Sequence, residues 1–226
     1  MRHILQAQYP DQANKVKFNI GDVRNRQSIP KLSVYYMIRY LILRLLFLKA
    51  FLLMRKVHFK GWAVIHAFKD CTIRIGEGMS IFSSFSSNML GLYQRCIIVA
   101  RYGGIIEIGK ECGISGSTIY AWKSIKIGDY TRVGANCKII DNDFHPLELA
   151  HRHKALNEEF ARRSPIVIGN DCFIGMNSII LKGSVLGNNV VVGAGSVVHG
   201  KFPDNVIIAG NPAKIVKYLT PEESHL

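Results

Sequence analysis

The feature that most constrains the fold is a repeat of six residues in the second half of the chain. Aliphatic residues recur at every sixth position, and glycine follows most of them; the positions are Ile168, Ile174, Ile180, Leu186, Val192 and Val198. An α-helix repeats its apolar positions every three or four residues, and a half-buried strand every two. A strict period of six instead predicts a parallel β-helix whose coil is a triangle, with one hexad on each side. We expect each aliphatic residue to point inward and each following glycine to allow a tight corner with positive φ.

The same period extends over most of residues 62–216 and is interrupted once. Ile108 and Ile114 are in step, and we expect Tyr120 to take the next core position, before one extra residue shifts the following hexads. Residues 141–165 contain no hexads, and the period resumes at Ile168. A long excursion from a regular solenoid is usually functional or disordered, and we expect a loop that projects from one corner.

Most of the positive charge lies before the repeat. Of the net charge of +13, residues 1–60 contribute +10, since they hold twelve Lys or Arg and two acids. Residues 32–54 are apolar and as long as a membrane span, but Arg39, Arg44 and Lys49 interrupt them. Each central cation costs about 2.5–3.5 kcal/mol on insertion, and each large apolar residue returns only about 0.5 kcal/mol. Two alternatives are therefore favoured over a span: a helix lying in the membrane interface, or helices packed on the solenoid.

These boundaries predict an all-β chain with an appendage. Residues 1–61 are expected to form an N-terminal arm and a helical, basic and apolar segment, residues 62–216 the β-helix, and residues 217–226 a tail. No secretion signal is recognisable at the start. We expect a cytoplasmic location, at the inner face of the membrane if the basic segment binds anionic lipid.

Five cysteines are present, and none forms a CxxC pair. Cys112, Cys137 and Cys172 each lie four residues after a core aliphatic residue, where a hexad has room for a second, small inward side chain. We therefore expect buried small hydrophobic residues in a reducing compartment, with neither a disulfide framework nor a thiol nucleophile.

The excursion begins with Asp141-Asn142-Asp143-Phe144-His145-Pro146. Histidine accepts and returns a proton near neutral pH better than any other side chain, so His145 is a candidate general base. A carboxylate could fix its tautomer. Asp143 and Asp141 are both candidates for that role, and the sequence does not choose between them.

Several motifs beyond the period resemble the hexapeptide-repeat acyltransferases of the sugar O-acetyltransferase type. They are Asp143-Phe144-His145-Pro146, Ile114-Ser115-Gly116, Ile180 to Gly183, Val192 to Val198, and Gly210 to Lys214. The resemblance, over about residues 70–216, implies a left-handed parallel β-helix and a homotrimer with active sites at subunit interfaces. It also implies that His145 deprotonates a saccharide hydroxyl, which attacks acetyl-CoA without a covalent acyl-enzyme.

The resemblance also implies where the two substrates bind. In the family, CoA lies along a groove between coils, where small residues expose the backbone and basic residues meet the phosphates. The residues that fit are Gly175, Lys182, Gly193, Ala194, Gly195, Ser196, Lys201, Asn211, Pro212 and Lys214. Asn142, Arg152 and Arg163 are candidates for the acceptor side. Many relatives carry Trp where this chain has Phe173, which affects expected local packing and not the chemistry.

Other functions remain open at this point. The acceptor could be the amine of an amino sugar or amino acid. The γ-class carbonic anhydrases share the solenoid and bind zinc through histidines, and His145, His151, His153 and His199 make that comparison worth stating. Because three of these histidines crowd one loop, we expect no metal site. An inactive scaffold is the third alternative, and no nucleic-acid partner is expected.

Overall fold

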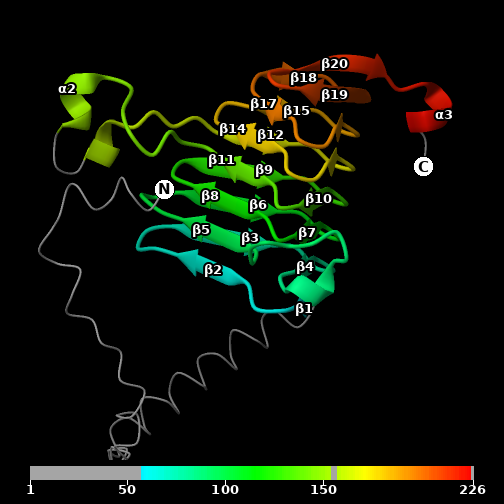
Figure 1. Cartoon of the computed structure of the whole chain (residues 1–226), viewed down its shortest axis with the longest axis horizontal. Helices are drawn as coiled ribbons and strands as arrows, with labels where there is room; N and C mark the ends of the chain where they lie inside the picture. The colour runs from blue at the N-terminus through cyan, green and yellow to red at the C-terminus, as the bar shows by residue number, and fades with distance from the viewer. Residues whose placement is uncertain (1–56, 154–156, 225–226) are drawn as a thin grey trace, which may run out of the picture. The chain divides into compact units, whose positions relative to one another are not determined.

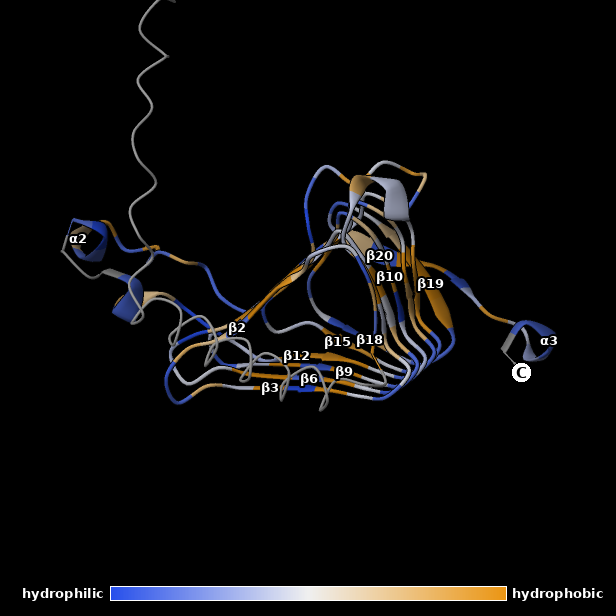
Figure 2. Ribbon diagram, turned by 90° about the horizontal axis from the view of Figure 1, so that it is seen from below, coloured by the Kyte–Doolittle hydropathy of each residue, from blue (hydrophilic) through white to orange (hydrophobic). Residues whose placement is uncertain are grey.

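The computed structural model describes residues 57–153 and 157–224, which form a left-handed parallel β-helix with three sheets as its sides (Figures 1 and 2). Sheet A contains β1 (His58–Lys60), β4 (Ser80–Phe82), β7 (Gly113–Ser115), β10 (Arg132–Ala135), β13 (Phe173–Ile174), β16 (Val191–Val192), β19 (Val206–Gly210) and β20 (Ala213–Tyr218). Sheet B contains β2 (Val64–Ala67), β5 (Ile97–Ala100), β8 (Thr118–Ala121), β11 (Lys138–Ile140), β14 (Ile179–Leu181) and β17 (Val197–Val198). Sheet C contains β3 (Thr72–Ile75), β6 (Ile105–Ile108), β9 (Ser124–Ile127), β12 (Ile166–Ile168), β15 (Val185–Leu186) and β18 (Lys201–Phe202).

Each coil of the solenoid runs from sheet A to sheet B to sheet C, so coil 1 is β1 to β3 and coil 4 is β10 to β12. Among the strands of the described residues, all pairs between coils are parallel, and β20 turns back antiparallel on β19. The predicted β-helix is therefore confirmed. Its first strand, β1, lies just before the expected boundary at residue 61, and β20 runs just past the expected end at residue 216.

The apolar segment 32–54, with its two alternative interpretations, lies outside the described residues. Within the described part of the chain, no helix is long and apolar enough to cross a membrane. The short helices there are η2 (Phe85–Ser87), α2 (Leu149–Arg152), η3 (Asn157–Phe160) and α3 (Pro221–Ser224).

The core is a stack of aliphatic columns inside the prism. On sheet A, Ile114, Val133 and Ile174 occupy matching positions on successive coils, and each is almost fully buried. Fully burying one such side chain contributes about 1.5–3 kcal/mol, so the columns supply the main driving force for stacking the coils. Cys112, Cys137 and Cys172 are buried beside these columns with free thiols, as predicted.

Tyr120 does not take the core position expected of it. Ile119 is fully buried on β8 and aligns with Ile139 of the next coil, whereas Tyr120 points outward. The step between core positions from Ile114 to Ile119 is one residue shorter than the step from Val133 to Ile139 in coil 4, and the register shifts between Val133 and Ala135 to absorb the difference. After β8, the step from Ile119 to Ile127 is eight residues, against six from Ile180 to Leu186, so the irregularity lies on both sides of this strand.

The glycines of the hexads serve a different purpose from the one expected. A Cβ on Gly169 would lie 2.4 Å from the carbonyl oxygen of Gly187 on the next coil, and one on Gly175 would lie 2.6 Å from the Ala194 nitrogen. Neither glycine has a positive φ. The residues with positive φ lie two positions later, Asp171 after Gly169 and Asn177 after Gly175. Glycine is needed because neighbouring coils approach too closely at the corners for a side chain.

Three columns of turns separate the sheets, and two of them carry long insertions. The AB corner joins sheet A to sheet B, and in coil 2 it holds residues 83–96, the AB loop. The BC corner joins sheet B to sheet C, and in coil 4 it holds residues 141–165, the excursion. Viewed along the solenoid, the AB loop and the excursion lie at the two ends of sheet B (Figure 2).

Candidate active site

The two limbs of the excursion are joined at their base. Asn142 and Arg163 form an antiparallel bridge, the Asp143 amide donates to the Arg162 carbonyl at 3.0 Å, and the Ser164 amide donates to the Asp141 carbonyl at 2.9 Å. The base therefore continues the order of the solenoid, and the residues after Asp141 start from a fixed position.

Asp141 anchors this base to the neighbouring coil. Its side chain is fully buried, and its two carboxylate oxygens accept the backbone amides of Trp122 and Lys123, both at 2.7 Å. The Asn142 amide group donates to the same carboxylate at 3.1 Å. Three hydrogen bonds to one carboxylate fix its orientation. Asp141 was expected as one of two possible partners of His145. In the structure its carboxylate instead holds the base of the excursion on the preceding coil.

The segment that carries His145 is a tight turn. The Asn142 side-chain oxygen accepts the Phe144 amide at 3.0 Å, Phe144 has φ +59°, and the His145 amide donates to the Asp143 carbonyl at 2.6 Å. His145 is exposed, and Pro146 after it is buried. Asn142, proposed from the sequence for acceptor binding, is itself buried, and both polar atoms of its side chain bond within the base of the excursion.

Aromatic rings of β8 and the turn after it pack against Phe144 in the turn that carries His145. The Phe144 ring lies 5.2 Å from Tyr120 and 5.6 Å from Trp122, centroid to centroid, and Trp122 lies 4.8 Å from Tyr102. Trp122 is buried, and its indole nitrogen has no hydrogen-bond partner among the described residues. Such edge-to-face contacts fix ring positions. No period in the sequence identifies this cluster, because Tyr120 lies on the outer face of β8 and Phe144 lies in the excursion of the next coil.

Asp143 pairs with Lys182, one of the lysines predicted to bind CoA phosphates. The Lys182 Nζ lies 2.6 Å from Asp143 Oδ1, and the two side chains are only 26% and 21% exposed. The second carboxylate oxygen, Oδ2, is buried and has no partner in the described parts of the chain. Lys182 thus ties the turn to the BC corner of the next coil, and Asp143 retains one oxygen that can accept a further hydrogen bond.

The remaining candidates of the excursion lie on its surface. Arg152 ends α2 and Arg163 belongs to the returning limb, and both are exposed. Arg162 donates to Glu148 at 2.6 Å, and this hydrogen bond lowers the pKa of the Glu148 carboxyl. His151 packs on Phe160 with 4.2 Å between ring centroids.

Most residues predicted to bind CoA gather at the AB corner near the C-terminal end of the solenoid. The set comprises Gly175, Gly193, Ala194, Gly195, Ser196, Asn211, Pro212 and Lys214. The Gly210 amide donates to the Ser196 hydroxyl at 3.1 Å, which joins the β19–β20 turn to this corner. Lys182 and Lys201 lie elsewhere, at or beside the BC corner. Within one chain the predicted residues are therefore divided between two corners, on either side of sheet B.

The AB corner has the exposed, small-residue backbone that a pantetheine arm needs. Ala194 and Gly195 are both exposed, and a Cβ added to Gly195 would meet nothing within 4 Å. Ser196 and Gly193 stabilise the turn between them, since the buried Ser196 hydroxyl donates to the Gly193 carbonyl at 2.6 Å. Gly175 is packed against the next coil, as described above.

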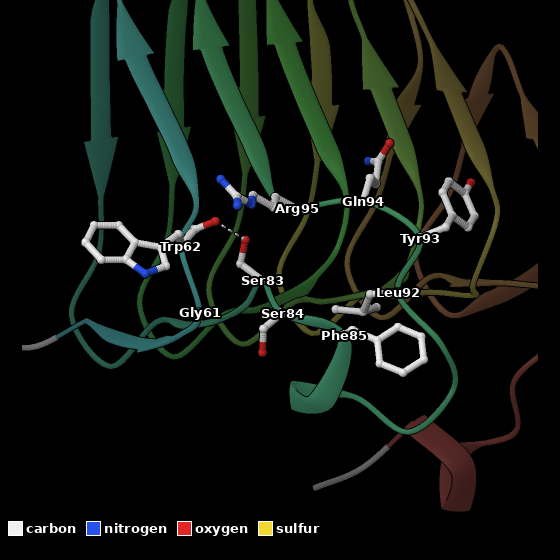
Figure 3. A pocket seen from close by; sticks show the side chains of 9 residues that line it. All are labelled: Gly61, Trp62, Ser83, Ser84, Phe85, Leu92, Tyr93, Gln94 and Arg95. Atoms are coloured by element: carbon white, nitrogen blue, oxygen red, sulfur yellow. Dashed lines mark hydrogen bonds between the residues drawn. The ribbon is translucent and has the colours of Figure 1, made fainter. Parts of the chain in front are cut away.

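A pocket of about 330 Å³ lies at the AB corner of the first two coils, beside the AB loop and away from the residues predicted to bind CoA (Figure 3). The Ser83 hydroxyl in its wall donates to the Trp62 carbonyl at 2.9 Å, and the Gln94 amide donates to the Gly116 carbonyl at the same distance. These polar groups are therefore bonded within the protein. In the part of the chain that the structure describes, no three His, Cys, Asp or Glu side chains are grouped as a metal site requires.

Known proteins match both the repeat and the fold. Residues 165–200 match the family model of the bacterial transferase hexapeptide (six repeats). A putative lipopolysaccharide biosynthesis O-acetyl transferase, WbbJ of Escherichia coli, is 29% identical over 73% of this chain and 83% of its own. The galactoside O-acetyltransferase of the same organism is 31% identical over 55% of this chain and 59% of its own length.

A solved structure resembles the fold. It is AntD, an N-acyltransferase from Bacillus cereus in complex with dTDP-4-amino-4,6-dideoxyglucose and coenzyme A, with a TM-score of 0.52 and 20% identity over 74% of this chain and 84% of that one. The repeat, the left-handed solenoid and these relatives agree with one another: residues 165–200 carry the bacterial transferase hexapeptide repeat, and the chain is similar to the hexapeptide-repeat acyltransferases.

Proposed function

We propose that this protein transfers an acetyl group from acetyl-CoA to a hydroxyl group of a saccharide, in a surface polysaccharide or its lipid-linked precursor. The observation that carries the proposal is the placement of His145: an exposed imidazole on a turn whose backbone is pinned to the solenoid. The relatives named for O-acetyl transfer support the reaction class, and WbbJ, named for lipopolysaccharide biosynthesis, supports a glycan acceptor.

In this proposal His145 is the general base. A hydroxyl is a poor nucleophile while it keeps its proton, so the imidazole takes that proton as the oxygen attacks the thioester carbonyl. Acetyl-CoA supplies the activated acyl group and a thiolate leaving group. His145 then returns the proton to the thiolate as the carbon–sulfur bond breaks. Asp143 is the carboxylate proposed to orient the ring, because its Oδ2 has no partner among the described residues, whereas both oxygens of Asp141 accept backbone amides.

We also propose a homotrimer, because the outer face of sheet B is apolar. Its outward side chains are mostly aliphatic or aromatic: Val64, Ile97, Val99, Tyr120, Ile140, Ile179, Leu181 and Val197. Sheet C is different, since Arg74, Glu107 and Lys126 align across it and Arg74 pairs with Glu107 at 2.6 Å. An apolar sheet face is stable only when covered, and three copies around a threefold axis would cover one another.

A trimer of this kind would also reunite the divided site. When sheet B of each copy faces the axis, the BC corner of one copy meets the AB corner of the next. His145, Lys182 and Lys201 of one copy would then face Ala194, Gly195 and Lys214 of its neighbour. Arg152 and Arg163 would remain on the acceptor side.

The test is turnover of the His145→Ala variant. We expect kcat to fall by about two to four orders of magnitude, the usual scale for loss of a general base, while acetyl-CoA affinity and trimer assembly stay nearly unchanged. His151→Ala is the matched control and should retain most of the activity. Normal turnover in His145→Ala together with an inactive His151→Ala would show that the wrong histidine was chosen.

The acceptor is tested by mass spectrometry of cellular polysaccharide with and without the gene. Loss of one acetyl unit that mild base also removes identifies an ester and an O-acetyltransferase. An acetyl unit that resists mild base would identify an amine acceptor instead.

The basic N-terminal region supports a further proposal, peripheral contact with anionic membrane. Well-placed cations contribute about 1 kcal/mol each near an anionic surface. The full chain is expected to pellet with anionic vesicles, and a chain that begins at Val57 is not. Equal recovery of both in the supernatant would remove the membrane contact.

A further inference from the structure

Two sets of exposed apolar side chains lie at opposite ends of sheet B. On the AB loop, Phe85 is 80% exposed, Met89 96%, Leu90 65% and Tyr93 71%. On the excursion, Leu147 is 59% exposed, Leu149 62% and Phe160 40%. Single exposed apolar residues are ordinary, but neighbouring ones on two projecting loops indicate surfaces that are covered in the assembled protein.

Both loops lie at the same height along the solenoid. The AB loop leaves coil 2 but folds onto coil 4: Asn136 donates to the Gly91 carbonyl at 3.1 Å and accepts the Tyr93 amide at 3.3 Å. Lys138 donates to Gln94 at 2.5 Å. Lys138 begins β11, and the excursion leaves directly from the end of that strand. The AB loop and the excursion are thus fixed to the two ends of one strand.

We infer that the AB loop of one copy packs against the excursion of the next copy in the trimer. This inference rests on the trimer proposed above, in which the AB corner of each copy meets the BC corner of its neighbour at equal height. The two apolar sets then cover each other, three times around the ring. The contact is heterologous, because two different patches meet. Three such contacts form a closed ring, because a threefold rotation returns to the first copy.

Charge on the two loops is compatible with this pairing. Arg95 lies near the end of the AB loop, is exposed and makes no ion pair with a described residue, whereas η3 of the excursion carries Glu158 and Glu159 in its first turn. Opposite charges at the rim of an apolar contact favour one orientation over others.

The contact would make each active site depend on the neighbouring copy. Leu147 and Leu149 follow His145 by two and four residues, and the intervening Pro146 is buried. Holding these leucines on the next copy therefore limits where the His145 turn can move. The AB loop of the neighbour serves as a positioning element for the base, without touching the reacting atoms.

Cysteine pairs test the contact in the full chain. Met89→Cys and Leu149→Cys are combined in a Cys71→Ser background and treated with a short bismaleimide. The other native cysteines, Cys96, Cys112, Cys137 and Cys172, are buried, and burial raises the pKa of each thiol, so they react slowly. The double variant should give covalent trimers on a denaturing gel. Each single variant should stay monomeric on the gel, and an equal mixture of the two should give covalent dimers.

The controls separate this inference from the trimer itself. Val216 is exposed to the same extent as Leu149 but lies on β20, so Val216→Cys with Leu149→Cys should give no covalent trimer. Light scattering that shows a trimer, without cross-links in the double variant, would overturn the loop pairing and leave the trimer standing. A stable, active monomer would overturn the trimer and the pairing together.

A second variant tests the consequence. Leu90→Glu should raise the dissociation constant of the trimer by about tenfold or more, and it should lower kcat with little change in the KM for acetyl-CoA. Val216→Glu should do neither. Loss of binding to anionic vesicles in Leu90→Glu, with assembly and kcat unchanged, would assign the AB loop to the membrane and refute the inference.

Discussion

Replacing Lys182 with methionine separates two roles that this lysine could have. The sequence suggests a phosphate partner for CoA, whereas the structure pairs its Nζ with Asp143 at 2.6 Å. Methionine keeps most of the apolar stem and removes the charge. The variant therefore leaves Asp143 with two carboxylate oxygens and no cation, in a position where one of them, Oδ2, already has no partner among the described residues.

The free energy lost on breaking the Lys182–Asp143 ion pair can be estimated from how deeply the pair is buried. An exposed ion pair contributes about 0.2–1 kcal/mol, and breaking a buried one costs about 3–5 kcal/mol. The Lys182 and Asp143 side chains are 26% and 21% exposed, so an intermediate value of about 2 kcal/mol is appropriate. At about 1.4 kcal/mol per factor of ten, this corresponds to roughly a thirtyfold shift toward a displaced turn. Because the His145 amide is bonded to the Asp143 carbonyl, we expect kcat to fall about ten- to thirtyfold.

Steady-state kinetics with acetyl-CoA as the varied substrate distinguishes the roles. An anchor lowers kcat and leaves the KM for acetyl-CoA nearly constant, and Lys182→Arg should recover part of the activity. Lys214→Met is the matched control, since Lys214 is exposed at the AB corner and should mainly raise the KM. A large rise in KM with normal kcat in Lys182→Met would refute the anchoring role and restore the phosphate contact.

Two further predictions concern the glycines and the thiols. Gly175→Ala should lower the free energy of unfolding by about 1–3 kcal/mol in denaturant titration, because its Cβ would lie 2.6 Å from the Ala194 nitrogen. A Cβ at Gly195 would meet open space, but the residue has φ +71°, so Gly195→Ala should lower the free energy of unfolding by about 1 kcal/mol and raise the KM for acetyl-CoA. Burial raises the pKa of the Cys172 thiol from 9.0 to about 11, so the unfolded chain ionises first, and the stabilisation present below pH 9 should be lost as pH rises toward 11. Thermal unfolding checks this assignment: the melting temperature of Cys172→Ser should depend less on pH between 9 and 11 than that of the natural chain.

The position of the excursion shows where sequence reasoning was sufficient. The hexads end at Asp141 and resume at Ile168, and the structure places the described strands on both sides of that interval. A break in a strict period is visible without coordinates, because a loop leaves no inward aliphatic residue to repeat. Local chemistry then draws attention to His145. The sequence could not choose between Asp141 and Asp143, because the partners of each carboxylate lie on other coils: Trp122 and Lys123 for one, Lys182 for the other.

The sequence by itself determined the solenoid, since a period of six can bury an aliphatic residue on every side of a triangle only if the chain coils. It also determined the inward cysteines and the position of the excursion. Tertiary structure decided the register at Tyr120, the reason for the hexad glycines, and the division of the predicted site between two corners. These depend on distances between backbones of successive coils, and on which corner each turn occupies. Residues adjacent in the coil stack are well separated in the chain, so no local pattern records their contacts.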